Sequence, residues 1–312
     1  MNDHTLPLTL HPDVAAALSA GQPVVALEST VITHGLPYPH NVDTALRMET
    51  AVRDGGAQPA TIAILHGRIH VGLTADQIAY LATRDRAALR KCSRRDLPIV
   101  LAQQGDGATT VAGTMILAHM AGIELFATGG IGGVHRGHPF DVSADLIELG
   151  RTPVTVVCSG AKSILDLPAT REVLETHGVP IVGYGTDDLP AFYTRRSGLP
   201  VDLRLDTPAA VADLIRARRA LRLASGTLVT VPVPAADALD PAELEAYVAT
   251  ATAEADAHGI HGAAATPWLL SRLVALTAGR SLQANAALLL QNGRVAAQIA
   301  AALADHAAAP VS

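Results

Sequence analysis

Aromatic residues and positive charge are scarce in this chain, and both shortages limit what it can bind. Phe, Tyr and Trp together make up 3% of the 312 residues, whereas surfaces that bind single-stranded nucleic acid use such side chains as stacking platforms. The formal net charge is −6, and proteins that hold a nucleic-acid backbone carry a basic face instead. We therefore expect no nucleic-acid partner. A small phosphorylated ligand needs only a local cluster of donors and stays compatible with this composition.

Cysteines and long apolar runs are also lacking. Cys92 and Cys158 are the two cysteines, which are too few for a disulfide framework and fit no zinc motif by their spacing. The segment Met1–Pro12 has no basic region followed by an apolar run, so it does not resemble a signal peptide. The Ala- and Leu-rich C-terminal stretches are interrupted by proline, arginine and glutamine, so we expect none to span a bilayer. The prediction is a cytoplasmic protein without membrane contact.

The chain instead shows a regular alternation of apolar β-branched runs with helical patterns. Strands are predicted at Pro23–Leu27, Ala60–Leu65, Arg68–Val71, Pro98–Ala102, Ile123–Ala127, Pro153–Cys158, Pro180–Gly183 and Thr227–Val233. Helices are predicted at Asn41–Asp54, Ala75–Thr83, Ala108–Ala121, Ser143–Leu149, Pro168–Thr176, Pro208–Leu221, Pro241–Ala257, Pro267–Ala278 and Leu282–Ala308. This alternation is typical of an α/β fold with a mostly parallel central sheet covered by helices on both faces. Since no clear linker interrupts it, we predict a single domain over residues 1–312.

Functional residues in such folds gather at the carboxyl ends of the strands, and Glu28 directly follows the first predicted strand. The Pro- and Gly-rich segment Thr33–Pro39 lies just beyond it. A carboxylate at a strand end beside such a loop can serve as a general acid with a raised pKa. A salt bridge or a helix cap is the alternative, and these residues alone do not choose between the two.

The chain has two lysines, Lys91 and Lys162, so the position of each is informative. Lys162 lies among small residues just past the strand predicted at Pro153–Cys158. We interpret it as lying near a helix start, whose positive end would favour the neutral, nucleophilic amine. Such an amine attacks a sugar carbon and forms a Schiff base. A lysine that extends along apolar surface to reach solvent is the alternative.

Lys91 opens the segment Lys91–Asp96, which contains three cations within five residues. Such a cluster suits an anionic ligand such as a phosphate. The alternative is a solvated surface run in which Arg95 pairs with Asp96.

Two glycine-rich segments and a pair of carboxylates complete the candidate site. Gly105–Thr110 is predicted to open a helix whose free amides could hold a phosphate. Gly129–Gly137 does not match the dinucleotide fingerprint and contains no Walker lysine. Asp141 and Asp145 are four residues apart and would face the same way on one helix. Paired carboxylates are ligands for Mg²⁺ or Mn²⁺, although an N-cap aspartate beside an exposed one is the common alternative.

In this order, these segments resemble the pseudouridine-5′-phosphate glycosidase family. The matching segments are residues 26–30, 33–39, 91–96, 107–111, 128–137, 141–145, 159–162 and 284–285. They extend from residue 23 to near residue 295, which is nearly the whole chain. The stretch at residues 138–139 is shorter than the corresponding family loop, so the rim of the site is expected to differ. The resemblance implies an α/β/α sandwich that forms homotrimers.

The resemblance also implies a role for each matching residue. Glu28 is the implied proton donor and Lys162 the implied nucleophile. Asp141 is the implied ligand of one divalent metal ion per subunit, usually Mn²⁺. The implied substrate-binding residues are Lys91, Val111, Ser143, Ala144, Asp145 and Asn285.

The implied activity is lyase-type cleavage of the C–C glycosidic bond of pseudouridine 5′-phosphate, through a lysine imine, to uracil and ribose 5-phosphate. Because carbon joins the base to the sugar, there is no glycosidic oxygen to protonate, and the usual two-carboxylate route suits this bond poorly. Two other functions remain open. A Schiff-base aldolase or phosphosugar isomerase would also need a strand-end lysine. A non-enzymatic phosphosugar-binding regulatory module would bind such a ligand without forming an imine.

Overall fold

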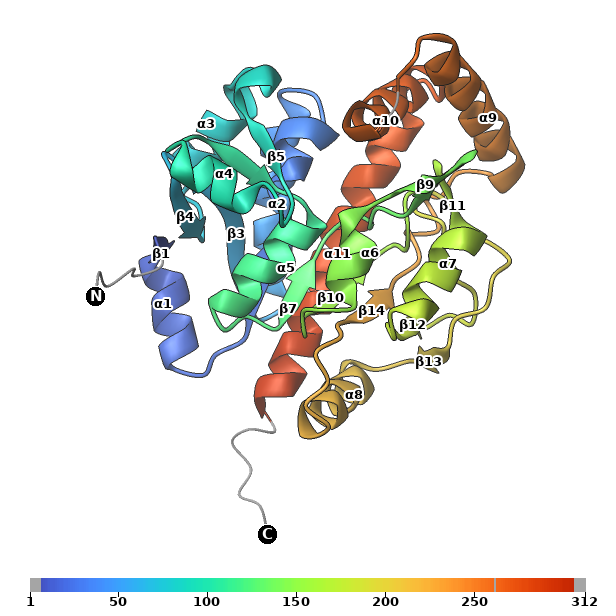
Figure 1. The fold of residues 1–312 in the computed structure, drawn as a ribbon. Coiled ribbons are helices and arrows are strands. Elements are labelled where there is room, and N and C mark those ends of the chain that lie inside the picture. The colour runs from blue at the N-terminus through green and yellow to red at the C-terminus, as the bar shows by residue number, and fades with distance from the viewer. Residues whose placement is uncertain (1–6, 261, 306–312) are drawn as a thin grey trace.

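The computed structural model describes residues 7–260 and 262–305, and its centre is a sheet of 11 strands (Figure 1). The strands of this sheet are β1 (Leu8–Leu10), β2 (Val24–Leu27), β3 (Gln58–Leu65), β4 (Arg68–Val71), β5 (Arg90–Cys92), β6 (Gly107–Thr109), β7 (Leu125–Ala127), β10 (Thr155–Cys158), β12 (Ile181–Tyr184), β13 (Leu203–Leu205) and β14 (Thr227–Thr230). Their order is β1-β4-β3-β2-β7-β10-β14-β12-β13, with β6 beside β3 and β5 beside β6. Within it, β3 pairs antiparallel with β4 and β6, and the other pairs are parallel. The predicted mostly parallel sheet is confirmed.

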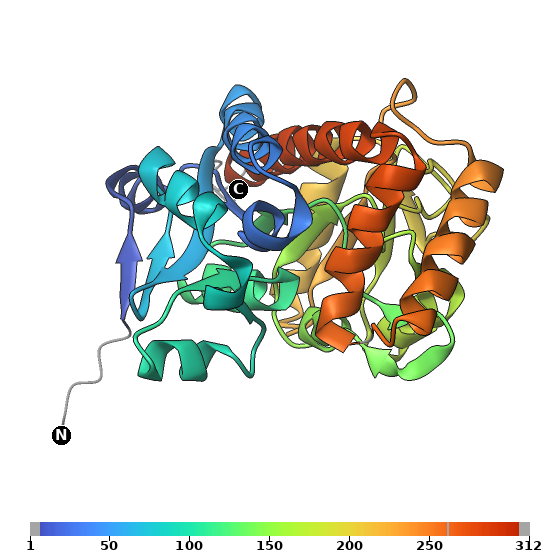
Figure 2. The same cartoon turned by 90° about the horizontal axis from the view of Figure 1, so that it is seen from above.

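Helices cover both faces of this sheet. They are α1 (Pro12–Ser19), α2 (His40–Asp54), α3 (Ala75–Thr83), α4 (Leu97–Ala102), α5 (Val111–Met120), α6 (Ala144–Leu149), α7 (Leu167–Thr176), α8 (Pro208–Ala220), α9 (Pro241–Ala257), α10 (Ala265–Leu276) and α11 (Arg280–Asp305), with short turns η1 (Val31–Gly35), η2 (Arg86–Ala88) and η3 (Gly262–Ala264). In Figure 2, α2 and α11 lie together on one side of the sheet, and α9 and α10 run side by side at its end. Helices α5, α6 and α7 cover the opposite face (Figure 1). The predicted α/β/α sandwich is confirmed.

A smaller antiparallel sheet lies beside the large one and carries part of the candidate site. It consists of β8 (Val134–His135), β9 (His138–Val142) and β11 (Leu165–Asp166), in the order β11-β8-β9. Leu165 pairs with His135 across β11 and β8. This sheet therefore brings the chain just after Lys162 against the hairpin that contains Asp141.

The central strands of the large sheet are buried on both faces by the helices. The four residues of β2 are all buried, as are those of β10 and β14. Strands that are buried in this way have continuous apolar sequences, which is why the sequence pattern predicted them. Where α2 ends, a Cβ built on Gly55 would lie 2.6 Å from the Cβ of Ala297 in α11. The alanine-rich sequence of α11 therefore permits the close approach of α2.

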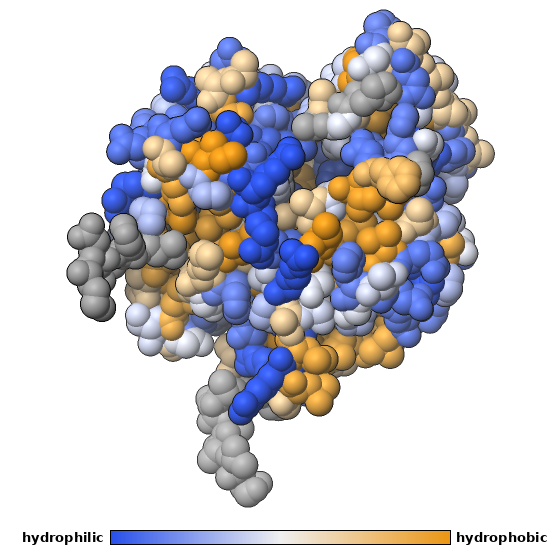
Figure 3. All heavy atoms as spheres, in the orientation of Figure 1, coloured by the Kyte–Doolittle hydropathy of each residue, from blue (hydrophilic) through white to orange (hydrophobic). Residues whose placement is uncertain are grey.

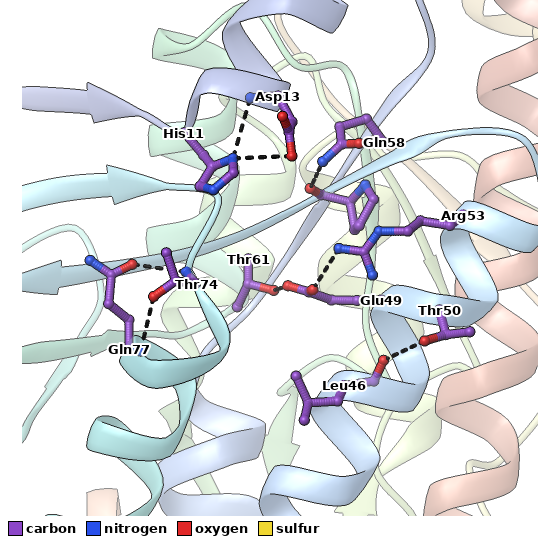
Figure 4. Close-up of polar contacts among 11 residues, drawn as sticks. His11, Asp13, Leu46, Glu49, Thr50, Arg53, Gln58, Thr61, Thr74 and Gln77 are labelled. Carbon is purple, nitrogen blue, oxygen red and sulfur yellow. Dashed lines mark hydrogen bonds and ion pairs between the residues drawn. The ribbon is translucent and has the colours of Figure 1, made fainter.

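A buried polar contact attaches α2 to β3 (Figure 4). The Thr61 hydroxyl donates to Glu49 Oε1 over 2.7 Å, and Arg53 Nη2 donates to Glu49 Oε2 over 3.0 Å. Glu49 and Thr61 are 5% and 2% exposed. Both carboxylate oxygens are therefore satisfied, as a buried charge requires.

Some predicted elements differ from those observed, and several short observed elements were not predicted. Residues 97–102 form helix α4 rather than a strand, with Pro98 in its first turn, where proline is compatible with a helix. Strand β5 was not predicted, because its three residues include two cations. Residues 107–109 form β6, so α5 begins at Val111 after the N-cap Thr110. Helix α11 is described to Asp305, and residues 306–308 of the predicted helix lie outside the described residues.

Within the described ranges, no single helix is long and apolar enough to cross a membrane. Helices α10 and α11 satisfy the length and composition criterion only as a pair, and they are bent by 118° relative to each other.

Candidate active site

A cavity of about 630 Å³ opens where several strands of the large sheet end at their carboxyl side. The face seen in Figure 3 is hollowed between one lobe built from the early strands and helices and another that includes α9 and α10. All the residues predicted for the site line this cavity, and they are Glu28, Lys91, Val111, Asp141, Ser143, Ala144, Asp145, Lys162 and Asn285. The structure thus brings together side chains that are up to 257 positions apart, from Glu28 to Asn285. Their individual roles remain predictions.

Glu28 lies at the carboxyl end of β2, where its carboxylate accepts hydrogen bonds from the hydroxyls of Thr30 and Thr128. Burial is the largest influence on this carboxyl group and raises its pKa. The positive charge of Lys162 and the two hydroxyls act in the opposite direction. A raised pKa keeps more of the protonated form near neutral pH, which is what a proton donor needs.

Lys162 follows β10, two strands away from β2 in the sheet. Its Nζ donates to the carbonyl of Gly130 over 2.7 Å, which holds the amine in the cavity rather than in solvent. The residue does not lie at a helix start, because a turn and β11 separate it from α7, which begins at Leu167. The predicted influence of a helix N-terminus on this amine was therefore wrong. Lys162 instead interacts electrostatically with Glu28 and Lys91, which line the same cavity.

Lys91 lies on β5 and faces the same cavity. Burial lowers the pKa of Lys91, and the positive charge of Lys162 lowers it further. Asp145 and Glu28 oppose this effect. Two cations and two carboxylates therefore interact within one cavity, and an anionic ligand would relieve the repulsion between the two lysines.

The arginines beside Lys91 are arranged differently from one another. Arg94 forms a paired contact with Glu148, through Nε at 2.8 Å and Nη2 at 2.6 Å. Arg95 is 85% exposed, and its Nε lies 3.8 Å from Asp96. Both arginines line the cavity. Of the three cations, Lys91 therefore lies deepest in the cavity, while Arg94 and Arg95 lie at the outer edge of the cavity.

The Asp145 carboxylate accepts hydrogen bonds from two backbone amides. Its Oδ1 accepts from the N–H of Ala112, and its Oδ2 accepts from the N–H of Gly132, both at 2.9 Å. It lies in the first turn of α6, whereas Asp141 lies on β9. The two carboxylates therefore do not share a helix face, and the predicted pairing by helical spacing was wrong. Ser143 caps the N-terminus of α6, because its hydroxyl accepts from the Asp145 N–H.

The start of α5 also faces the cavity. The Ala112 N–H is held by Asp145, and the Gly113 N–H is held by the Thr110 hydroxyl over 3.3 Å. Within residues 7–260 and 262–305, the N–H of Val111 is the one of the first three helical amides that remains for a ligand. An amide at a helix N-terminus suits a phosphate oxygen.

A divalent metal ion would find few protein ligands in this cavity. Among residues 7–260 and 262–305, no group of three His, Cys, Asp or Glu side chains is arranged to hold one. Asp141 lies close enough to His135 to oppose the lowering of the His135 pKa by burial. Mg²⁺ and similar hard cations keep several waters and use one or two carboxylates. The residues present therefore fit a largely hydrated ion held by Asp141, and they do not fit a closed protein cage.

Three cavity features were missed by the sequence reasoning as contributors to the site. Thr128, at the end of β7, donates to Glu28. His34 lines the cavity, and burial together with the charges of Lys91 and Arg86 lowers its pKa to about 4, so the ring is neutral at neutral pH. Asn292 of α11 lies behind the wall and donates to the carbonyls of Thr128 and Gly129, at 2.8 and 3.4 Å. Asn292 lies two helical turns after Asn285 on the same face of α11, but this spacing alone does not distinguish it from other polar residues.

Replacing Asn292 with alanine should lower the free energy of unfolding by about 2–3 kcal/mol, because it removes the hydrogen bonds that the side chain makes with the buried Thr128 carbonyl and the Ser159 hydroxyl. Urea denaturation would measure this loss. The exposed Gln298 of the same helix provides the control, and its replacement with alanine should change stability by less than about 0.5 kcal/mol. Equal effects at the two positions would contradict the role given to Asn292.

Comparison with known proteins identifies close relatives. Residues 13–302 match the family described as "Indigoidine synthase A like protein". The chain is 54% identical over 298 residues to the pseudouridine-5′-phosphate glycosidase of Hahella chejuensis, a match that covers 94% of this chain and 97% of that one. It is 57% identical over 298 residues to the protein of the same name from Herpetosiphon aurantiacus, covering 95% and 98%.

Two solved structures have the same fold at high similarity. The prealnumycin C-glycosynthase AlnA, in complex with ribulose 5-phosphate, superimposes with a TM-score of 0.88 at 43% identity, covering 96% of this chain and 98% of that one. An indigoidine synthase A-like protein from Thermotoga maritima gives a TM-score of 0.88 at 36% identity, covering 97% and 99%.

Proposed function

The chain belongs to the family of indigoidine synthase A like proteins, and on that premise we propose that it cleaves the C–C glycosidic bond of pseudouridine 5′-phosphate to uracil and ribose 5-phosphate. The relatives named above bear out the resemblance inferred from the sequence. The observation that carries the proposal is that Glu28 and Lys162 share one cavity and influence each other electrostatically. These are the acid and the amine that cleavage through an imine requires.

The first step opens the sugar ring. The Lys162 amine attacks C1′, and the bond from C1′ to the ring oxygen breaks as Glu28 protonates that oxygen. The attacking nitrogen then loses a proton to water. The hydrogen bonds from Thr30 and Thr128 fix the Glu28 carboxyl, and the bond to Gly130 fixes the Lys162 amine. Such positioning removes much of the entropic cost of bringing two reacting groups together.

The second step breaks the carbon–carbon bond. The lone pair on the Lys162 nitrogen forms the C1′=N bond as the electron pair of the C1′–C5 bond leaves with uracil, which is then protonated at C5. Water adds to the imine and releases ribose 5-phosphate with the free amine. Lys91 and the Val111 N–H, which line the same cavity, are suited to hold the phosphate through both steps.

A hydrated Mn²⁺ ion is the proposed cofactor, with Asp141 as its protein ligand. When bound, it would polarise substrate oxygens through ordered water. Replacing Asp141 with asparagine should raise the Mn²⁺ concentration needed for half-maximal activity by at least about tenfold, because a neutral amide binds a hard cation less strongly than a carboxylate does. Titration of EDTA-treated protein with Mn²⁺ would measure this change. An unchanged titration curve would remove Asp141 as the ligand.

We also propose that residues 1–312 act as one catalytic domain in a cytoplasmic homotrimer. One buried apolar cluster extends from Val14 to Leu303, which supports a single folding unit. The exposed apolar side chains of Phe140, Leu221 and Leu223 suit contacts between subunits. Light scattering should give three times the chain mass of 32.2 kDa, and a monomer mass would contradict the trimer.

The test of the reaction uses the wild-type protein with Mn²⁺ and pseudouridine 5′-phosphate. We expect free uracil in solution and, after borohydride reduction, a ribose-phosphate adduct on Lys162 detected by peptide mass spectrometry. An adduct without uracil would favour a Schiff-base aldolase or phosphosugar isomerase. Binding of ribose 5-phosphate with neither uracil nor adduct would favour a regulatory module.

A further inference from the structure

We propose that Arg136 is a positioning residue for the nucleophile, because it clamps the turn that begins at Lys162. This inference rests on the proposed role of Lys162. Among the described residues, Arg136 is not one of those that line the main cavity. It would therefore act through the backbone of its neighbours rather than by touching the substrate.

The turn itself is short and hydrogen-bonded. The Leu165 N–H donates to the Lys162 carbonyl over 3.0 Å, which closes a four-residue turn. The Lys162 N–H donates to the carbonyl of Ile131 over 3.2 Å. These bonds use the carbonyl of Lys162, and the carbonyls of Ser163 and Leu165 accept from side-chain donors.

Arg136 supplies those donors. Its Nη2 donates to the Ser163 carbonyl over 3.0 Å, and its Nε donates to the Leu165 carbonyl over 3.2 Å. The planar guanidinium thus spans the turn with two fixed donors, a geometry that the single ammonium of lysine cannot reproduce.

The turn is buried, so these contacts matter energetically. Ser163, Ile164 and Leu165 are 4%, 1% and 1% exposed. Among the residues that the structure describes, the buried Ser163 hydroxyl has no hydrogen-bond partner, so this side chain does not hold the turn in place. Buried carbonyls without a donor are costly, and loss of Arg136 would favour a rearranged turn that admits water.

The other side of Arg136 is fixed to α9. Its Nη1 and Nη2 contact the two carboxylate oxygens of Glu245 at 2.5 and 3.1 Å. Helix α9 packs against α10, which contributes Thr266, Pro267 and Leu270 to the cavity wall. Arg136 therefore links the turn that begins at Lys162 to helices α9 and α10, and α10 forms part of the cavity wall.

Arg136→Gln is expected to lower kcat by about 10- to 100-fold, because a displacement of about 1 Å at the reacting atom has an effect of this size. KM should change by less than about threefold, because Lys91 and Val111 lie on other elements. The borohydride-trapped adduct should form correspondingly more slowly. Arg136→Lys, which keeps one donor and the charge, should recover part of the lost kcat.

Two controls separate positioning from general stability. Glu245→Gln breaks the ion pair but keeps the contacts of Arg136 with both carbonyls, so kcat should stay within about threefold of the wild type. Arg219 lies on α8 and forms a comparable surface ion pair with Glu124. Arg219→Gln removes this pair and should leave kcat unchanged. Thermal unfolding of each variant would report any shared loss of stability.

The outcomes distinguish this inference from the proposed function. If the wild type releases uracil and the Arg136→Gln and Arg136→Lys variants have normal kcat per folded molecule, the positioning role is overturned while the function stands. A KM increase with unchanged kcat would also overturn it. If the wild type releases no uracil and forms no adduct on Lys162, the proposed function fails first.

Discussion

Replacing Lys162 with alanine should lower uracil release by about 10³-fold or more, the scale seen when an enzyme loses its nucleophile. The amine is held in the cavity by the Gly130 carbonyl, beside the carboxyl group of Glu28. Alanine provides no atom that can form a bond to C1′, so the ring cannot open through an imine. Borohydride should then trap no adduct. Uracil release would be measured by chromatography under saturating substrate.

The matched control for this variant is Lys162→Arg. Arginine keeps the positive charge, but its guanidinium stays protonated and cannot act as a nucleophile. If charge alone mattered, the arginine variant would retain most of the activity. We expect it to be as inactive as the alanine variant while still binding ribose 5-phosphate. Near-normal uracil release by either variant would exclude the imine mechanism.

Local sequence signals explain why Glu28 and Lys162 were expected at one edge of the sheet, whereas Val111, Ala144 and Asn285 were named only by the family resemblance. Glu28 and Lys162 each follow a continuous apolar run, and such runs identify buried parallel strands. Carboxyl ends of parallel strands meet at one edge of a sheet, so the two residues were expected to be close. The order of strands between them, with β7 in the middle, is not encoded in any local pattern.

The errors share a physical origin. Asp141 and Asp145 have helical spacing, but Ser143 caps α6, so the chain upstream is free to pair as β9. Strand β5, which contains Lys91, was not predicted, because only its pairing with β6 makes this short charged segment a strand. In both cases a contact distant in sequence decided the local conformation, which propensity alone does not predict.

The supporting residues could not be identified from sequence for a related reason. Arg136 acts on the carbonyls of residues 27 and 29 positions away, and Asn292 acts on carbonyls more than 160 positions away. Backbone carbonyls carry no sequence signal, so a side chain that satisfies them looks like any other polar residue. Such residues become visible only when each buried backbone group is assigned a partner.

Replacing Glu28 with glutamine should lower kcat by about 10²- to 10⁴-fold, the usual range for removing a general acid. The amide has nearly the shape of the carboxyl group and can still contact Thr30 and Thr128, but it has no proton to give to the ring oxygen. KM should change little, because the phosphate contacts lie elsewhere in the cavity. Steady-state kinetics would separate the two constants.

The same substitution should stabilise the free protein, and increasingly so as the pH rises. Burial raises the pKa of Glu28 above its unfolded value, so the folded state binds the proton more tightly than the unfolded state does. The stability from this group is then fully present below the unfolded pKa and is lost as pH rises through the folded pKa. Glutamine stays neutral at every pH and avoids that loss. Thermal unfolding at pH 5 and pH 8 should therefore show a larger gain for Glu28→Gln at pH 8.

This pairing of lost activity with gained stability distinguishes a functional carboxyl group from a structural one. A carboxylate kept for a salt bridge has a lowered pKa. Its replacement costs more stability as the pH rises from the folded to the unfolded pKa, and the cost is constant above the unfolded pKa. Glu28 has the opposite shift even though Lys162 is near, because desolvation outweighs the attraction. A variant that lost both activity and stability at pH 8 would show that Glu28 serves the fold, and the proton donor would have to be another group of the cavity.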